Sequence, residues 1–255
     1  MKARYVNLVL FCIVLAVLIA IPFLSGKIFT INQNAPWLFS PFNSGDSLST
    51  VYKERYRILE QNALIHRIED TTRTIISVMI DGWGVPYDEN MLEQDFASFG
   101  QKNVVPVVHK RLLNYTSHAE NVEYRTGFSE GVFVANGDSL VCAKKEKEQG
   151  GYFKQIVCCE NCNDLQTVDM LDSLASDGVW SRIAWTAHGT REGDRETLHE
   201  VLRRLSAVAG RHPDAQFIIQ GTHRPILGTP ETRRKYNAHW VPAVFINCKL
   251  KTEKK

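Results

Sequence analysis

Runs of apolar residues with different periods along the chain predict alternating strands and helices. Helical spacing of apolar residues predicts helices over 47–70, 89–100, 167–178 and 194–210. Short apolar runs between glycine, proline and polar residues predict strands over 74–80, 103–113, 130–136, 139–143, 152–159, 181–190, 215–225 and 239–248. This alternation predicts an α/β fold with a mainly parallel sheet and helices on both faces.

The amino-terminal pattern differs from the rest of the chain. Residues 7–26 form an apolar run that is long enough to span a bilayer as one helix. Lys2 and Arg4 precede this run, which favours a cytoplasmic amino terminus and an exported remainder. A cleaved signal peptide is the alternative, but no convincing small-x-small cleavage site lies near 24–27.

We therefore expect three parts. Residues 1–26 would be a single-pass anchor in the cell (inner) membrane, preceding the fold as one transmembrane helix, and the turn-rich residues 27–46 would be a linker. Residues 47–255 would form one α/β domain in the periplasm or outside the cell.

Charge and cysteine content narrow the function classes. Positive and negative residues are interspersed and the net charge is +2, which argues against a nucleic-acid partner. Cys158, Cys159 and Cys162 have a spacing compatible with zinc or redox chemistry. A second CxxC pair is absent, and an exported domain favours disulfides with Cys142 or Cys248, so we interpret the cluster as structural.

Four metal-ligand side chains lie at the tips of predicted strands. Asp81 follows the strand at 74–80, and His188, His223 and His239 lie beside the ends of three later strands. In open α/β sheets, ligands bind where such strand ends and their loops converge. A carboxylate with three imidazoles suits zinc or manganese, so the pattern predicts a divalent-metal site.

The motifs around these residues resemble a known family. "MIDGWGVP" around Asp81 resembles the opening of cofactor-independent phosphoglycerate mutases, members of the alkaline phosphatase superfamily. The resemblance implies that Asp81 binds a metal and that Ser129, in "GFSE", is the nucleophile. "TAHGTREG", "QGTHRP" and "NAHWVPAVFI" then follow in the family's order and contribute His188, His223 and His239.

Two positions depart from the family pattern. Thr222 replaces the acid that the family has before the strand-end histidine, and Ala184 replaces the acid four residues before the earlier histidine. The large inserted domain of the mutases is also missing. Sulfatases and membrane-anchored phosphoethanolamine or phosphoglycerol transferases share the superfamily's sheet, and many share the anchor.

The resemblance implies a membrane-anchored, metal-dependent hydrolase or transferase that acts on phosphate or sulfate esters. One metal at Asp81 and His223 would activate Ser129, and a second at His188 and His239 would activate water or steady the leaving group. The other partners would be the membrane and an anionic ester, which a planar guanidinium fork could clamp; the candidates are Arg191 and Arg224.

Two alternatives remain open. The loss of acids at 184 and 222 is consistent with a catalytically degenerate, tethered binding or scaffold domain, and the polar stretch at 109–127 could line its cleft. Alternatively, "WTAHGTREGDRETLHEVLRRL" resembles the first catalytic segment of sirohydrochlorin-type chelatases. That resemblance implies a tetrapyrrole metal-binding role for His188 alone.

Overall fold

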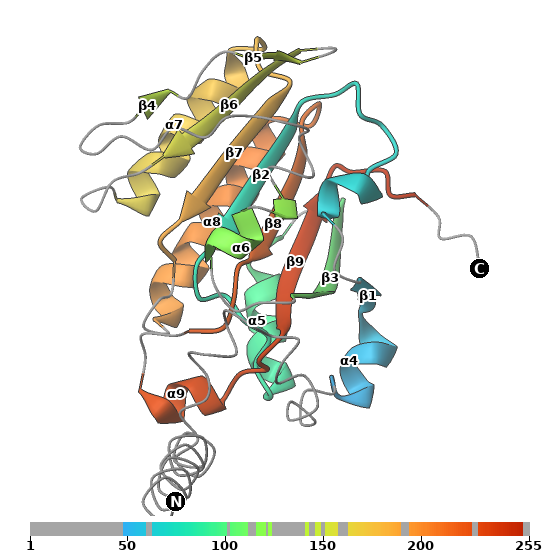
Figure 1. Ribbon diagram of the computed structural model, residues 1–255, viewed down its shortest axis with the longest axis vertical. Helices are drawn as coiled ribbons and strands as arrows, with labels where there is room; N and C mark the ends of the chain where they lie inside the picture. Colours follow the sequence, from blue (N-terminus) through green and yellow to red (C-terminus); the bar gives the residue numbers. More distant parts are fainter. Residues whose placement is uncertain are drawn as a thin grey trace, which may run out of the picture. The chain divides into compact units, whose positions relative to one another are not determined.

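A mixed β-sheet organises the part of the chain that the computed structural model describes. The described residues are 48–59, 63–100, 103–111, 116–120, 122–123, 141–142, 146–148, 151–157, 163–189, 194–225 and 229–251. The strands among them are β1 (Arg57–Leu59), β2 (Ile75–Ile80), β3 (Val104–Lys110), β4 (Val141–Cys142), β5 (Glu146–Glu148), β6 (Gly151–Val157), β7 (Arg182–Ala187), β8 (Gln216–Gly221) and β9 (Trp240–Ile246). They form one sheet in the order β1-β3-β9-β8-β2-β7-β6-β4, with β5 beside β6 (Figure 1).

The α/β class is confirmed, but the expectation of a mainly parallel sheet needs correction. Strand β2 pairs in parallel with β7 and β8, whereas β9 runs antiparallel between β8 and β3. Four of the eight pairings between described strands are antiparallel, because β4 and β5 also oppose β6. All seven residues of β9 are buried, so its uniform apolar pattern carries no information about strand direction.

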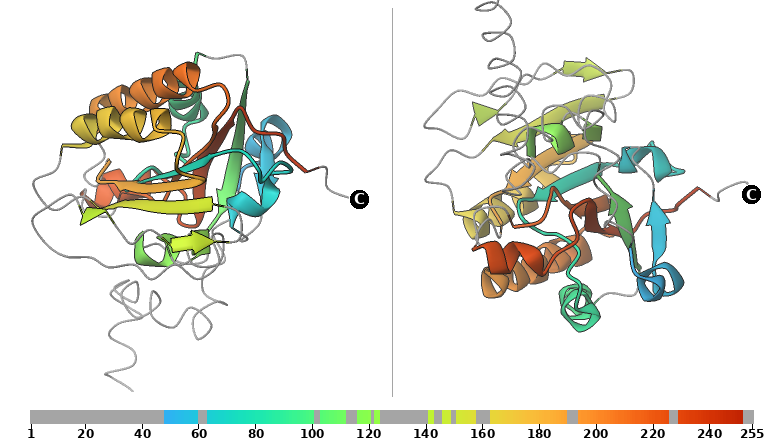
Figure 2. Two further views of the ribbon diagram at one scale, coloured as in Figure 1. Left: turned by 90° about the horizontal axis from the view of Figure 1, so that it is seen from above. Right: turned by 60° about the horizontal axis from the view of Figure 1, so that its bottom comes forward.

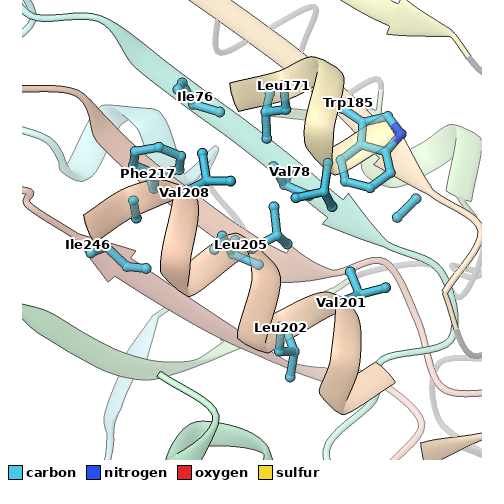
Figure 3. Packing of buried hydrophobic residues seen from close by; sticks show 14 of the residues in the cluster. Ile76, Val78, Leu171, Trp185, Val201, Leu202, Leu205, Val208, Phe217 and Ile246 are labelled. Atoms are coloured by element: carbon cyan, nitrogen blue, oxygen red, sulfur yellow. The ribbon is translucent and has the colours of Figure 1, made fainter. Parts of the chain in front are cut away.

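One face of the sheet is covered by the two long helices, α7 (Asp164–Ser176) and α8 (Arg195–Arg211) (Figure 2, left). Helix α8 begins after Asp194, whose carboxylate accepts hydrogen bonds from the backbone N–H groups of Glu196 and Thr197. The apolar residues that predicted this helix are buried against the sheet, which confirms that prediction. They are Leu198, Val201, Leu202, Leu205 and Val208, and Figure 3 shows four of them packed near Val78, Trp185 and Phe217.

On the opposite face, the described elements are shorter. The short helix α6 (Thr116–Glu120) and the 3-10 turn η2 (Leu64–Arg67) lie on this side (Figure 2). Leu64 from η2 and Ala119 from α6 are buried in a second apolar cluster, which includes Met79 and Phe245 of the sheet. Described helices therefore lie on both faces of the sheet, as expected. Helix α6 also contributes to the site at the strand ends, which is described below.

The remaining described helices are α4 (Thr50–Arg55), α5 (Glu89–Ala97) and α9 (Pro230–Arg234). The long helix predicted over 47–70 is wrong. Helix α4 ends at Arg55, Tyr56 is extended, and the chain continues as β1, which pairs in parallel with β3. Strand pairing that buries Leu59 outweighs the helical spacing of this segment.

The predicted anchor and linker, residues 1–46, lie outside the described residues, as does the strand predicted at 130–136. Among the residues that the structure describes, no helix combines the length and the apolar character needed to cross a membrane. The chain from Asp46 to Lys255 forms one compact unit.

Candidate functional site at the edge of the sheet

The predicted metal ligands are gathered along one edge of the sheet. Strands β2, β7 and β8 are parallel, so Asp81, His188 and His223 follow them at the same edge (Figure 1). Strand β9 runs in the opposite direction, which brings His239 to this edge at the start of its strand. A shared edge does not place all four side chains in contact, and their individual partners differ.

Close backbone packing explains the glycines that follow Asp81. Gly82 has φ +73°, a left-handed conformation that favours glycine. A Cβ atom on Gly84 would lie 2.7 Å from the Cα of Arg224, and one on Gly221 would lie 1.8 Å from the carbonyl oxygen of Trp83. The two loops after β2 and β8 can pack this closely only without side chains at positions 84 and 221.

Asp95 of α5 also fixes the position of the loop after β2 through hydrogen bonds. The Trp83 indole Nε1 donates to Asp95 Oδ2 over 3.1 Å, and Arg195 and His199 of α8 bind Asp95 Oδ1 at 2.5 and 2.8 Å. Burial raises the pKa of Asp95, although the charge of Arg195 and the hydrogen bonds from His199 and Trp83 oppose that rise. Asp95 thereby joins α5 and α8 to the loop that carries Asp81.

Asp81 is at the centre of a polar cluster that contains two threonines and a histidine. Its side chain is buried, and its Oδ1 accepts hydrogen bonds from the hydroxyls of Thr116 at 2.6 Å and Thr222 at 2.9 Å. The Thr116 Oγ1 atom also lies 3.2 Å from Nε2 of His223, and that Nε2 is 3.9 Å from Asp81 Oδ1. Three separate segments, at 81, 116 and 222–223, thus meet at one carboxylate.

The orientation of the His223 ring follows from its second nitrogen. Nδ1 lies 2.7 Å from the carbonyl oxygen of Arg224, and a carbonyl can only accept, so Nδ1 carries a hydrogen. In the neutral imidazole, Nε2 is then the basic nitrogen, and it faces the Thr116 hydroxyl. A hydroxyl beside an oriented imidazole is the geometry that nucleophilic catalysis requires.

Glu120 adds a second carboxylate to the same side of the sheet. It lies one helical turn after Thr116 in α6 and accepts a hydrogen bond from the Thr186 hydroxyl at 2.8 Å. Burial raises the pKa of Glu120, the Thr186 hydrogen bond opposes this, and the negative charge of Asp81 raises the pKa further. Glu120 was not among the residues predicted from the sequence.

His188 is held by a different carboxylate from the one that contacts His223. Asp164 accepts the backbone N–H groups of His188 at 3.0 Å and Gly189 at 2.8 Å, and its Oδ1 lies 3.4 Å from His188 Nδ1. Burial acts to raise the pKa of Asp164, but the hydrogen bonds from His188 and Gly189 outweigh it and lower that pKa. The His188 loop therefore has a structural attachment at the start of α7.

Of the other predicted site residues, two lie in the connections next to β8 and β9, and two lie outside the described residues. His239 lies in the connection that enters β9, two strands from β2 in the sheet order, and its backbone carbonyl accepts the N–H of Arg111 at 2.7 Å. Arg224 is half-buried directly after His223. Ser129 and Arg191 lie outside the described residues, so their predicted roles stay predictions.

The donor set tests the predicted zinc or manganese ion. Within the described ranges, no group of three or more His, Cys, Asp or Glu side chains is placed to hold a metal ion. Asp81 and His223 supply two donors, whereas zinc sites in proteins use at least three. The described residues do not fit the predicted two-metal arrangement, and no step proposed below is routed through a metal.

The two positions that lack acids have different surroundings. Thr222 is buried at the edge and donates to Asp81. Ala184 is buried within β7, opposite Ser77 of β2, three residues before the strand ends. Only the substitution at 222 directly affects the Asp81 cluster.

Sequence reasoning missed Thr116 as a site residue. The stretch at 109–127 was expected to line a cleft because it is rich in polar residues, and Thr116 lies within it. The available signal was its place after the strand at 103–113, because β3 runs in the same direction as β8 and ends at the same edge. A five-residue helix has too little periodicity to reveal which of its side chains faces Asp81.

Comparisons with known proteins leave the family open. No protein-family model matches the chain, and no curated protein matches it. Among solved structures, the PH0037 protein from Pyrococcus horikoshii is similar over 71% of this chain and 87% of that chain, with 9% identity and a TM-score of 0.32. Similarity at this level carries no inference about function.

Proposed function

We propose that the chain is a membrane-anchored hydrolase or transferase for phosphate or sulfate esters, with Thr116 as the nucleophile and His223 as the general base. The supporting observation is the Thr116 hydroxyl, which lies between Asp81 Oδ1 and the basic nitrogen of His223. The class of ester comes from the resemblance of the DGWG motif and of the ordered histidines to the alkaline phosphatase superfamily.

The reaction follows from these positions. The Thr116 hydroxyl rotates its single hydrogen from Asp81 Oδ1 toward Nε2 of neutral His223, which accepts it while Oγ1 attacks the phosphorus or sulfur atom. The bond to the departing alcohol oxygen breaks, and His223 Nε2 returns the proton to that oxygen. Water or a second alcohol then attacks the group on Thr116 and gives its proton to His223 Nε2, which passes it to the departing Thr116 oxygen, so the same site can support hydrolysis or transfer. Arg224, next to His223, offers a guanidinium for the anionic ester.

Substitution of the nucleophile tests this function. With p-nitrophenyl phosphate and p-nitrophenyl sulfate as substrates, Thr116→Ala should lower kcat/KM by roughly 100-fold or more, because it removes the hydroxyl that lies against both Asp81 and His223. Thr116→Ser should retain a measurable rate because it keeps the hydroxyl. Ser129→Ala is the control and should remain near wild type.

The possible outcomes separate the two nucleophile assignments. Loss of activity in Ser129→Ala, with Thr116→Ala near wild type, would return the nucleophile to the serine that the resemblance implies. Turnover that neither substitution lowers would exclude both hydroxyls as the nucleophile.

A second candidate function is ester binding without turnover by the same fold. It is favoured by the two hydroxyl donors on Asp81 Oδ1, which hold one carboxylate oxygen and the Thr116 hydroxyl in a hydrogen-bonded cluster. This candidate predicts saturable binding of p-nitrophenyl phosphate or sulfate that Arg224→Ala weakens, with no release of p-nitrophenol.

A further inference from the structure

Asp81 is already stabilised by hydrogen bonds in the place where the family resemblance implies a cation. Its Oδ1 accepts one hydroxyl from Thr116 at 2.6 Å and one from Thr222 at 2.9 Å. A carboxylate oxygen has two lone pairs, so these two donors use the hydrogen-bonding capacity of Oδ1. Hydrogen bonds to the charged form are one of the ways in which a protein stabilises a buried carboxylate.

Thr222 is held in this position by the sheet. Its backbone N–H donates to the carbonyl oxygen of Ile80 at 3.1 Å, directly before Asp81, and its side chain is fully buried. An aspartate at 222 would place a second carboxylate against Asp81, and two adjacent carboxylates favour a shared proton or a bound cation. Threonine offers a proton donor instead of a second negative charge.

We propose that Thr222 makes the Asp81 cluster independent of a divalent cation, because the Thr222 and Thr116 hydroxyls together occupy Asp81 Oδ1 and Thr222 takes the place of the second carboxylate that would hold a metal. The proposal deepens the proposed function by removing its need for a metal. Its principal test measures metal binding and does not depend on turnover.

The test restores the missing acid in the full-length chain. Wild type and Thr222→Asp are incubated with zinc or manganese, freed of unbound metal and analysed for metal content and thermal unfolding. Thr222→Asp should retain a stoichiometric metal ion, because Asp81, His223 and the new carboxylate then supply three donors. Metal should raise the Tm of this variant, and wild type should show neither effect.

Thr72→Asp is the matched control. The Thr72 hydroxyl donates to Oδ1 of Asp70 at 2.7 Å on an exposed loop, so the same substitution adds an acid beside an acid at the surface. This variant should not retain metal. Adding Asp81→Asn to Thr222→Asp should abolish the retained metal, which locates the ion at the Asp81 cluster.

The proposal is overturned if wild type retains stoichiometric zinc or manganese that Asp81→Asn releases, or if these ions raise the Tm of wild type as they raise that of Thr222→Asp. It is also overturned if folded Thr222→Asp retains no metal. Should Thr222→Asp fail to fold, the metal content and Tm of wild type decide the question. Thr222→Ser keeps the hydroxyl and should give the same metal content and Tm response as wild type. Loss of the Thr116→Ala effect on turnover would instead reject the proposed function and leave the metal result standing.

Discussion

His109 is a fully buried residue of β3 whose two ring nitrogens lack a hydrogen-bond partner of normal geometry. The nearest charged groups belong to an internal ion pair, in which Arg111 Nη1 lies 3.0 Å from Glu123 Oε1. Glu123 Oε1 is 3.7 Å from His109 Nε2. Burial lowers the pKa of His109 well below its ordinary value, Arg111 lowers it further, and the backbone of Leu59 opposes them.

This neutral histidine predicts an acid-sensitive fold. Above about pH 6.5 the imidazole is neutral in both the folded and the unfolded chain. As the pH falls below that value, the unfolded chain gains a proton that the folded chain does not, so the free energy of unfolding decreases by up to about 1.4 kcal/mol per pH unit. His109→Leu should remove this part of the pH dependence, as measured by denaturant unfolding at neutral and mildly acid pH. His66→Leu, at an exposed site, is the control; an unchanged slope in His109→Leu would contradict the prediction.

Gly189 tests how closely the His188 loop packs on Asp81. Its φ is +57°, and a Cβ there would lie 2.5 Å from the carbonyl oxygen of Asp81. Gly178 has φ +65° but open space around its Cβ position. Gly178→Ala should cost about 1 to 2 kcal/mol from backbone strain alone. Gly189→Ala should cost about 1 to 3 kcal/mol more because of overpacking. Equal losses of unfolding free energy in the two variants would contradict the close approach.

At the scale of elements, Asp95 connects α5, α8 and the loop after β2. Asp95→Ala leaves the buried Trp83 Nε1 without its acceptor and removes the carboxylate that pairs with Arg195, so we expect a loss of about 2 to 4 kcal/mol in unfolding free energy. Asp169→Ala, which removes an exposed ion pair with Arg204, should change stability by less than about 1 kcal/mol. Denaturant unfolding gives the unfolding free energy of both variants. Similar losses in the two variants would contradict the role of Asp95 in connecting α5, α8 and the loop after β2.

The elements that could be predicted from the sequence are those whose local pattern of apolar and polar residues is enough to specify a helix or a strand. Helix α8 has apolar residues on one face and a capping Asp194, and β2 is a mostly apolar run that ends at Asp81-Gly82. The short helix α4 and strand β1 could not be separated, because the pairing of Leu59 with His109 depends on a strand distant in sequence. The direction of β9 depends on its neighbours in the same way.

The site could be predicted only in part, because some of its residues are marked by local sequence and others only by tertiary contacts. Asp81 and His223 carry a visible signal, because each is an ionisable residue at the end of an apolar strand. Their bonds to Thr116 and Thr222 arise from tertiary contact, and threonine is too common in loops to mark a site. The substitution of threonine for an acid at 222 was visible in the sequence, whereas its donation to Asp81 required the structure.

At the scale of the whole molecule, the predicted anchor can be tested apart from the site. The full-length chain should remain in the membrane fraction after an alkaline carbonate wash, because the apolar run at 7–26 is long enough to span a bilayer. Deletion of residues 1–46 should release the chain into the soluble fraction, since Asp46–Lys255 forms one compact unit. Release of the full-length chain by carbonate would contradict an integral anchor.

The central position of β2 affects how the chain is made. Both of its neighbours, β7 and β8, are synthesised more than a hundred residues later. Until the ribosome has completed them, the six buried residues of β2 have no native strand to pair with. Pairing between strands that are distant in sequence slows folding and leaves aggregation-prone intermediates exposed. A nascent chain truncated before residue 216 should therefore bind chaperones through this segment.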